Sequence, residues 1–91
     1  MSTYLLTYDL NRSGKDYKTL EAAIQSYRAI KLGTTTTYLI STTETAQQIR
    51  NYLGAKIDSN DELFVAKLFG AGTWASTNLR ANVVAWLTNN L

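Results

Sequence analysis

The chain has 91 residues, of which 45% are hydrophobic and 11% aromatic, and its formal net charge is +2. This length fits a single domain, and the absence of histidine and cysteine excludes catalytic triads, thiol nucleophiles and the usual zinc sites. The nine basic residues are scattered along the chain. That pattern is more typical of an ordinary soluble surface than of a strongly basic nucleic-acid-binding face.

The start of the chain lacks the charged region, apolar core and cleavage site of a signal peptide. No run approaches the roughly 18 apolar residues of a membrane span. We therefore expect a cytoplasmic protein with no membrane partner. One domain is expected over residues 1–91, with a core over about 3–70 and a C-terminal extension over about 71–91.

The first predicted strand covers residues 3–10 and delivers one carboxylate, Asp9, to its end. Its even-numbered residues are apolar or aromatic and predict a face that packs beneath helices, whereas the other face is half polar. A loop over 11–15 follows, and Asp16 is the expected N-cap of a helix over about 17–29. Residues 29–32 then predict a short strand that turns at Gly33.

Four threonines open the next predicted strand, over 34–41, and their hydroxyl groups indicate an exposed or edge position. Thr42 or Thr43 is expected to cap a helix over about 44–53, with Glu44 in its first turn. Residues 62–69 read as a strongly apolar, central strand. In the tail, Asn78 or Thr77 is the expected cap of a last helix.

The order of these elements predicts an α+β fold of the ferredoxin-like βαββαβ type with an added C-terminal helix. Its two main helices would cover one face of the sheet and leave the face that carries Leu5 uncovered. We therefore expect that face to be buried in a dimer. The apolar tail, which holds Trp74 and Trp86, also needs a surface to cover, either its own sheet or a neighbour's.

The chemistry that remains after these exclusions is that of carboxylates and hard cations. A phosphate-binding loop with its lysine and a complete dinucleotide fingerprint are both absent, and Leu63 stands where a calcium loop needs glycine. A lone aspartate is a poor metal site, but two symmetry-related copies of Asp9 can share an ion, since magnesium takes one or two carboxylates and keeps several waters. The alternative is that Asp9 caps the loop over 10–15 through backbone N–H groups.

The run Tyr4-Leu5-Leu6-Thr7-Tyr8-Asp9-Leu10-Asn11, the loop with Gly14 and Asp16-Tyr17, and the later Ile57-Asp58-Ser59-Asn60-Asp61-Glu62-Leu63 resemble the small SinR-like proteins. Those proteins are similar to the second CRISPR-associated protein family and to the VapD ribonucleases. The resemblance covers residues 3–70. It implies a ferredoxin-like protomer and a homodimer whose sheets face each other.

In the CRISPR-associated family, the aspartate that ends the first strand is the proposed magnesium ligand at the dimer interface, and that role falls on Asp9. Some members are instead non-catalytic scaffolds that bind DNA by surface charge. This chain departs from the family in two ways. Only Arg12 and Lys15 follow Asp9 as phosphate-binding candidates, and the tail reads as a helix where that family has another strand.

Three hypotheses follow. The first is a dimeric, magnesium-dependent endonuclease with paired Asp9 residues as catalytic groups and metal ligands. The second is a non-catalytic dimer that binds RNA or DNA through Arg12 and Lys15, with Arg50 as a further candidate. The third is a homo-oligomeric interaction module, or one that binds a protein partner through its C-terminal segment.

Overall fold

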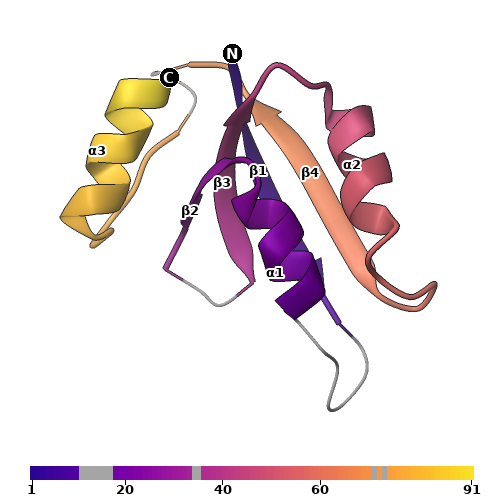
Figure 1. Ribbon diagram of the computed structural model, residues 1–91. Coiled ribbons are helices and arrows are strands. Elements are labelled where there is room, and N and C mark those ends of the chain that lie inside the picture. Colours follow the sequence, from indigo (N-terminus) through magenta and orange to yellow (C-terminus); the bar gives the residue numbers. More distant parts are fainter. Residues whose placement is uncertain (11–17, 34–35, 71, 73) are drawn as a thin grey trace.

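The structure is a computed structural model that describes residues 1–10, 18–33, 36–70, 72 and 74–91. Within these residues, one four-stranded antiparallel sheet and three helices form an α+β fold (Figure 1). The elements in chain order are β1 (Ser2–Asp9), α1 (Lys18–Gln25), β2 (Arg28–Lys31), β3 (Thr37–Thr42), α2 (Ala46–Gly54), β4 (Glu62–Leu68) and α3 (Ala81–Asn90). None of the helices in the described ranges has the length and hydrophobicity needed to cross a membrane.

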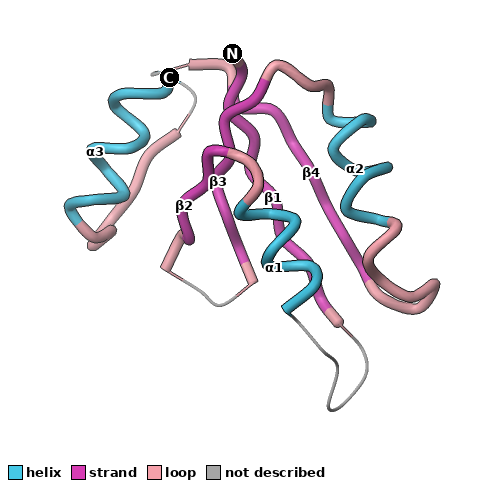
Figure 2. Tube along the Cα trace, viewed as in Figure 1, coloured by secondary structure: helices cyan, strands magenta, loops and turns pink. Residues whose placement is uncertain are grey.

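The strand order across the sheet is β2-β3-β1-β4, and every neighbouring pair is antiparallel. β1 therefore lies inside the sheet, and β4 is an edge strand (Figure 2). The prediction of a central position for residues 62–69 is wrong. The threonine-rich strand, expected at an edge, is the internal strand β3, in which the residues from Tyr38 to Thr42 are buried.

The main core lies between one face of the sheet and helices α1 and α2. Because register partners in antiparallel strands share a face, the even-numbered side chains of β1 lie together with Tyr38 and Ile40 of β3. Ile24 of α1 and Ile49 of α2 close this cluster, and both are fully buried. The predicted core face of the first strand is thereby confirmed.

The second face of the sheet is partly covered by α3. Val83 and Leu87 of this helix pack against Leu39 of β3, with Leu5 and Ile30 alongside. Two hydrogen bonds hold the helix in place. The Thr3 hydroxyl donates to the carbonyl of Asn90 (2.8 Å), and the Arg80 guanidinium donates to the carbonyl of Lys31 (2.9 Å). The apolar tail therefore covers its own sheet.

Helix boundaries differ from the predictions for local reasons. α1 ends four residues before the expected position because the Tyr27 N–H donates to the carbonyl of Ile24 (3.0 Å) and closes the helix with a tight turn. Thr45, rather than Thr42 or Thr43, caps α2, because Gln48 three residues later completes a capping box with it. Glu44 consequently precedes the helix.

The remaining cap predictions concern the first and last helices. Asn78 does not cap α3. It adopts a left-handed backbone conformation (φ 62°), and Arg80 occupies the N-cap position without a side-chain hydrogen bond. Thr77 likewise lies before the helix. The expected cap of the first helix, Asp16, lies outside the described residues.

Candidate functional site

Asp9 is the last residue of β1, as the sequence predicts, and its side chain is exposed. The alternation along the strand places it on the second face of the sheet, together with Leu5 and Thr7. The strand itself is fixed up to this point. The Tyr8 N–H donates to the carbonyl of Thr36 (3.2 Å), and the aromatic ring of Tyr8 is buried in the core. A carboxylate is thus presented from a rigid strand end.

A second carboxylate lies directly opposite Asp9. The β1–β4 register pairs Asp9 with Glu62, the first residue of β4, so both side chains lie on the same face. Directly opposed residues in antiparallel strands have Cβ atoms about 5 Å apart, and like charges there destabilise the sheet. Within the described ranges, neither carboxylate forms an ion pair with a lysine or arginine. A cation held between the two would remove this repulsion.

The two carboxylates line an open hollow of about 370 Å³ at this end of the sheet, whose other lining residues are Thr7, Tyr8, Leu63 and Phe64. Two carboxylates and room for water form the donor set that a partly hydrated magnesium ion uses. No group of three or more metal-ligating side chains occurs among the described residues. The described residues of one protomer therefore bring two carboxylates, Asp9 and Glu62, to this strand end.

The other predicted nucleic-acid contacts are not brought to this hollow by the described residues. Arg12 and Lys15 lie outside the described ranges, as does the loop that Asp9 would cap in the alternative reading. Arg50 lies on α2, where its guanidinium donates to the Asn51 side chain (2.8 and 3.2 Å). It lines a neighbouring hollow beside Phe64 and Val65.

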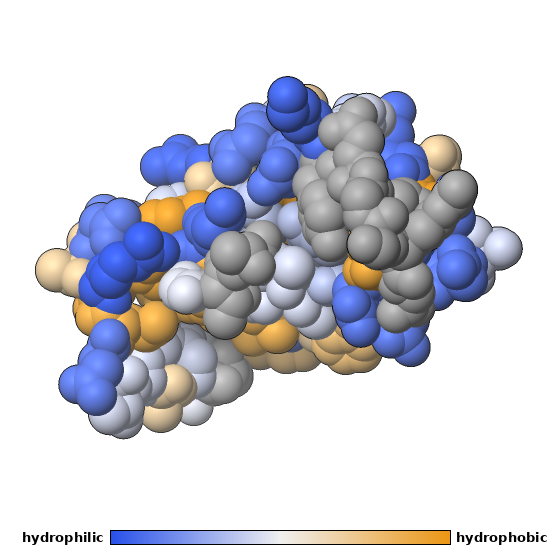
Figure 3. All heavy atoms as spheres, turned by 90° about the horizontal axis from the view of Figure 1, so that it is seen from below, coloured by the Kyte–Doolittle hydropathy of each residue, from blue (hydrophilic) through white to orange (hydrophobic). Residues whose placement is uncertain are grey.

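Phe64 is the largest apolar side chain exposed next to the carboxylates, with 59% of its surface accessible. Its register partner is Thr7, so it lies on the second face two residues beyond Glu62. A space-filling view from below shows hydrophobic surface along the border opposite α1 and α2 (Figure 3). The cluster beneath α3 includes Leu39 of β3, Leu5 of β1 and Leu68 of β4, so the part of this face that remains open is the end of β1 and β4 at Phe64.

The two tryptophans of the tail are half-buried against the cluster beneath α3. In the described part of the chain, the indole N–H of Trp74 is buried and has no hydrogen-bond partner. Trp86 belongs to the helix itself. Both rings therefore pack in the contact between α3 and its own sheet. Any contact of the C-terminal segment with a protein partner stays a prediction.

Sequence reasoning missed Glu62 and Phe64 as neighbours of Asp9. The signal that would find them is the strand order, because an antiparallel pair of β1 and β4 brings the end of one strand to the start of the other. Comparisons with protein-family models, with curated proteins and with solved structures find no match for this chain. The geometry around Asp9 is therefore the structural basis for a functional proposal.

Proposed function

We propose that the chain is a ferredoxin-like protein that acts on nucleic acid as a homodimer. Three features support the fold proposal. The strand order β2-β3-β1-β4 is fully antiparallel, α1 and α2 pack on one face, and each of these helices connects two strands separated by a third. The proposal for function rests on the resemblance of the Asp9 strand and the 57–63 segment to the SinR-like and CRISPR-associated proteins.

The proposed activity is magnesium-dependent hydrolysis of a phosphodiester. The observation that carries it is the direct pairing of Asp9 with Glu62 on an exposed strand end, where no described basic residue neutralises either carboxylate. These two side chains would hold the ion. When bound, it would polarise a phosphoryl oxygen and activate water. Arg12 and Lys15, which follow Asp9 in sequence, are the proposed phosphate contacts.

The proposed dimer uses the open end of the second face, where β1 ends and β4 begins. Phe64 supplies an exposed apolar anchor there, whereas α3 covers Leu39, Leu5 and Leu68 elsewhere on the same face. A second copy placed on this end would bring two Asp9–Glu62 pairs to one interface. The tail forms a helix where the CRISPR-associated family has another strand, and this helix thus restricts where the sheets of the two protomers can meet.

The proposal is tested by cleavage of labelled single-stranded RNA and duplex DNA, in magnesium and in chelator. Wild type is compared with Asp9→Asn and with Glu21→Gln, a matched control whose carboxylate lies on α1. Cleavage that requires magnesium and is lost only in Asp9→Asn, with the dimer intact by light scattering, is the expected result. The preferred substrate would also distinguish RNA from DNA. Equal cleavage by Asp9→Asn, or in chelator, would refute the catalytic role.

A second function is favoured by the exposure of Phe64, which points to assembly without chemistry. In that case the chain is a non-catalytic dimer or interaction module, and any nucleic-acid binding depends on surface charge. Binding without cleavage, weakening steeply with added salt, would support it, since the affinity then comes from counterion release. Binding that does not change with salt would exclude it.

A further inference from the structure

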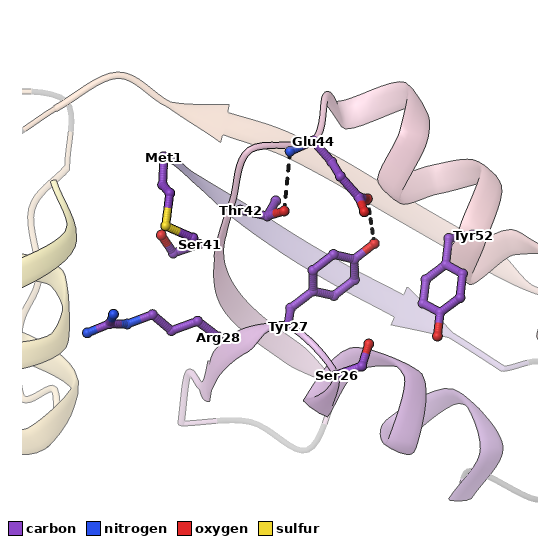
Figure 4. A pocket seen from close by; sticks show the side chains of 8 residues that line it. All are labelled: Met1, Ser26, Tyr27, Arg28, Ser41, Thr42, Glu44 and Tyr52. Carbon is purple, nitrogen blue, oxygen red and sulfur yellow. Dashed lines mark hydrogen bonds between the residues drawn. The ribbon is translucent and has the colours of Figure 1, made fainter.

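A second hollow lies at the opposite end of the sheet from Asp9 and is built around Glu44. Three hydrogen bonds fix this residue. Its N–H donates to the Thr42 hydroxyl (3.2 Å), its carbonyl accepts from the Tyr4 hydroxyl (2.7 Å), and its carboxylate oxygen Oε1 accepts from the Tyr27 hydroxyl (2.8 Å) (Figure 4). The negative charge is therefore held in one place on the wall of an open hollow of about 380 Å³.

Two tyrosine rings line the same hollow. Tyr27 follows α1 and Tyr52 lies on α2, and their ring centroids are 6.0 Å apart with an interplanar angle of 83°. Each ring carries negative charge density on its faces, which attracts cations. Tyr52 already shows this behaviour, because the Lys56 ammonium lies 5.3 Å from its centroid. Lys56 does not line the hollow.

The Glu44 carboxylate has no cationic partner among the described residues. Arg28 also lines the hollow, but its side chain extends away from Glu44 (Figure 4). One carboxylate oxygen is engaged by Tyr27. The hollow thus combines a half-buried, fixed negative charge with two aromatic rings at right angles, and it contains no neutralising group at the carboxylate.

We propose that this hollow binds an alkylammonium group, with Glu44 supplying the charge and Tyr27 and Tyr52 supplying ring faces. A single carboxylate is a poor ligand set for a metal ion, which prefers several oxygen ligands. Aromatic rings instead favour a weakly hydrated organic cation, such as a methylated ammonium. The group would come either from a free amine or from a methylated lysine of another protein. This inference is independent of the function proposed for Asp9.

The test is a titration of the ¹⁵N-labelled protein with choline, followed by amide chemical shifts. The control ligand is 3,3-dimethyl-1-butanol, which has the shape of choline without its charge. Choline is expected to shift the signals around Tyr27, Glu44 and Tyr52 with millimolar affinity, and the uncharged analogue is not. Equal shifts with both ligands, or no local shift with choline, would overturn the proposal.

Three variants test the named residues. Glu44→Gln keeps an acceptor for Tyr27 but removes the charge, and Tyr52→Leu removes a ring; each should weaken choline binding about tenfold. Tyr52→Phe keeps the ring and should bind like wild type. Unchanged shifts far from the hollow establish that each variant is folded. Unaltered affinity in both Glu44→Gln and Tyr52→Leu would refute the site.

The source of the ammonium group is resolved by a short peptide with one trimethyllysine, compared with the same peptide carrying an unmodified lysine. Tighter binding of the methylated peptide than of choline would assign the site to a protein side chain. Binding no tighter than that of choline would assign it to a free amine. Either result keeps the alkylammonium proposal, whereas preference for the unmodified peptide would contradict it.

Discussion

The hydrogen bond between Tyr27 and Glu44 joins the start of β2 to the segment that precedes α2. Burial raises the pKa of the Tyr27 hydroxyl well above its ordinary value, and the hydrogen bond to Glu44 and the negative charge of Glu44 add to this effect. The phenol therefore stays protonated in the folded protein at pH values where an unfolded tyrosine, with a pKa of about 10, would ionise. It acts as a donor throughout the neutral range.

This shift predicts a specific dependence of stability on pH. A folded-state pKa above the unfolded value contributes stability that is complete below about pH 10 and is lost as the pH rises further. Tyr27→Phe should lower the free energy of unfolding by about 1 kcal/mol at neutral pH. The difference between wild type and Tyr27→Phe should shrink above about pH 10, as measured by urea unfolding. Parallel pH profiles for the two proteins would contradict this account.

At the scale of single residues, the sequence predicts the position of a residue within its own strand but not its partner on the neighbouring strand. The position of Asp9 at a strand end follows from one run of residues, and the structure has it there. Its neighbour Glu62 lies more than fifty positions away in sequence, and only the register of β1 with β4 brings them together. The proposed role of Asp9 as a metal ligand remains a prediction.

At the scale of elements, hydrophobic content does not reveal which strands are neighbours. β4 is apolar because Leu63 and Val65 face the main core while Phe64 faces the open end of the other side, yet it is an edge strand. β3 carries threonines although it is an internal strand of the sheet, because their hydroxyl groups form hydrogen bonds. The Thr37 hydroxyl, for example, shares a hydrogen bond with that of Thr7 (3.1 Å).

The end of α1 was mispredicted because apolar periodicity continues past it. Ile24 and Tyr27 both pack on the main core, but Tyr27 reaches it from the connection to β2 rather than from the helix. The cap of α2 was mispredicted because three threonines precede the helix within four positions. Only Thr45 has a glutamine three residues later. The side-chain oxygen of Gln48 accepts from the Thr45 N–H, and the Gln48 backbone N–H donates to the Thr45 hydroxyl.

The exposed aromatic side chains of the β4 segment predict how the chain assembles. Phe64→Ser should lower the dimer fraction, because Phe64 would be the apolar anchor of the proposed interface. Phe69→Ser is the matched control. Phe69 is 77% exposed and lies beyond the end of β4, with the Lys67 ammonium 5.3 Å from its ring centroid. Analytical ultracentrifugation measures the dimer fraction, and equal effects of the two variants would argue against this interface.

At the scale of the whole molecule, the alternation of strands and helices predicts the layer arrangement well. α1 and α2 lie on one face of the sheet, as expected from their order (Figure 1). The tail was expected to need an apolar surface, and its own sheet supplies it through Leu39. Periodicity within the tail does not specify which face it covers, because that depends on contacts with residues far away in sequence.

Asp9 and Glu62 lie at one end of this sheet and Glu44 at the other, so the two proposed sites are separate and can be tested independently. The central claim is that Asp9 and Glu62 together bind a divalent cation. Manganese, which replaces magnesium in many oxygen-ligand sites, reports such binding by broadening nearby NMR signals.

The most direct measurement is therefore the amide spectrum of the ¹⁵N-labelled protein with substoichiometric manganese. The account predicts selective broadening of the signals of Asp9, Glu62 and their neighbours, reversed by excess magnesium. The broadening should be lost in Asp9→Asn and retained in the control Glu21→Gln. Absence of selective broadening in wild type, or the same broadening in Asp9→Asn, would contradict the claim.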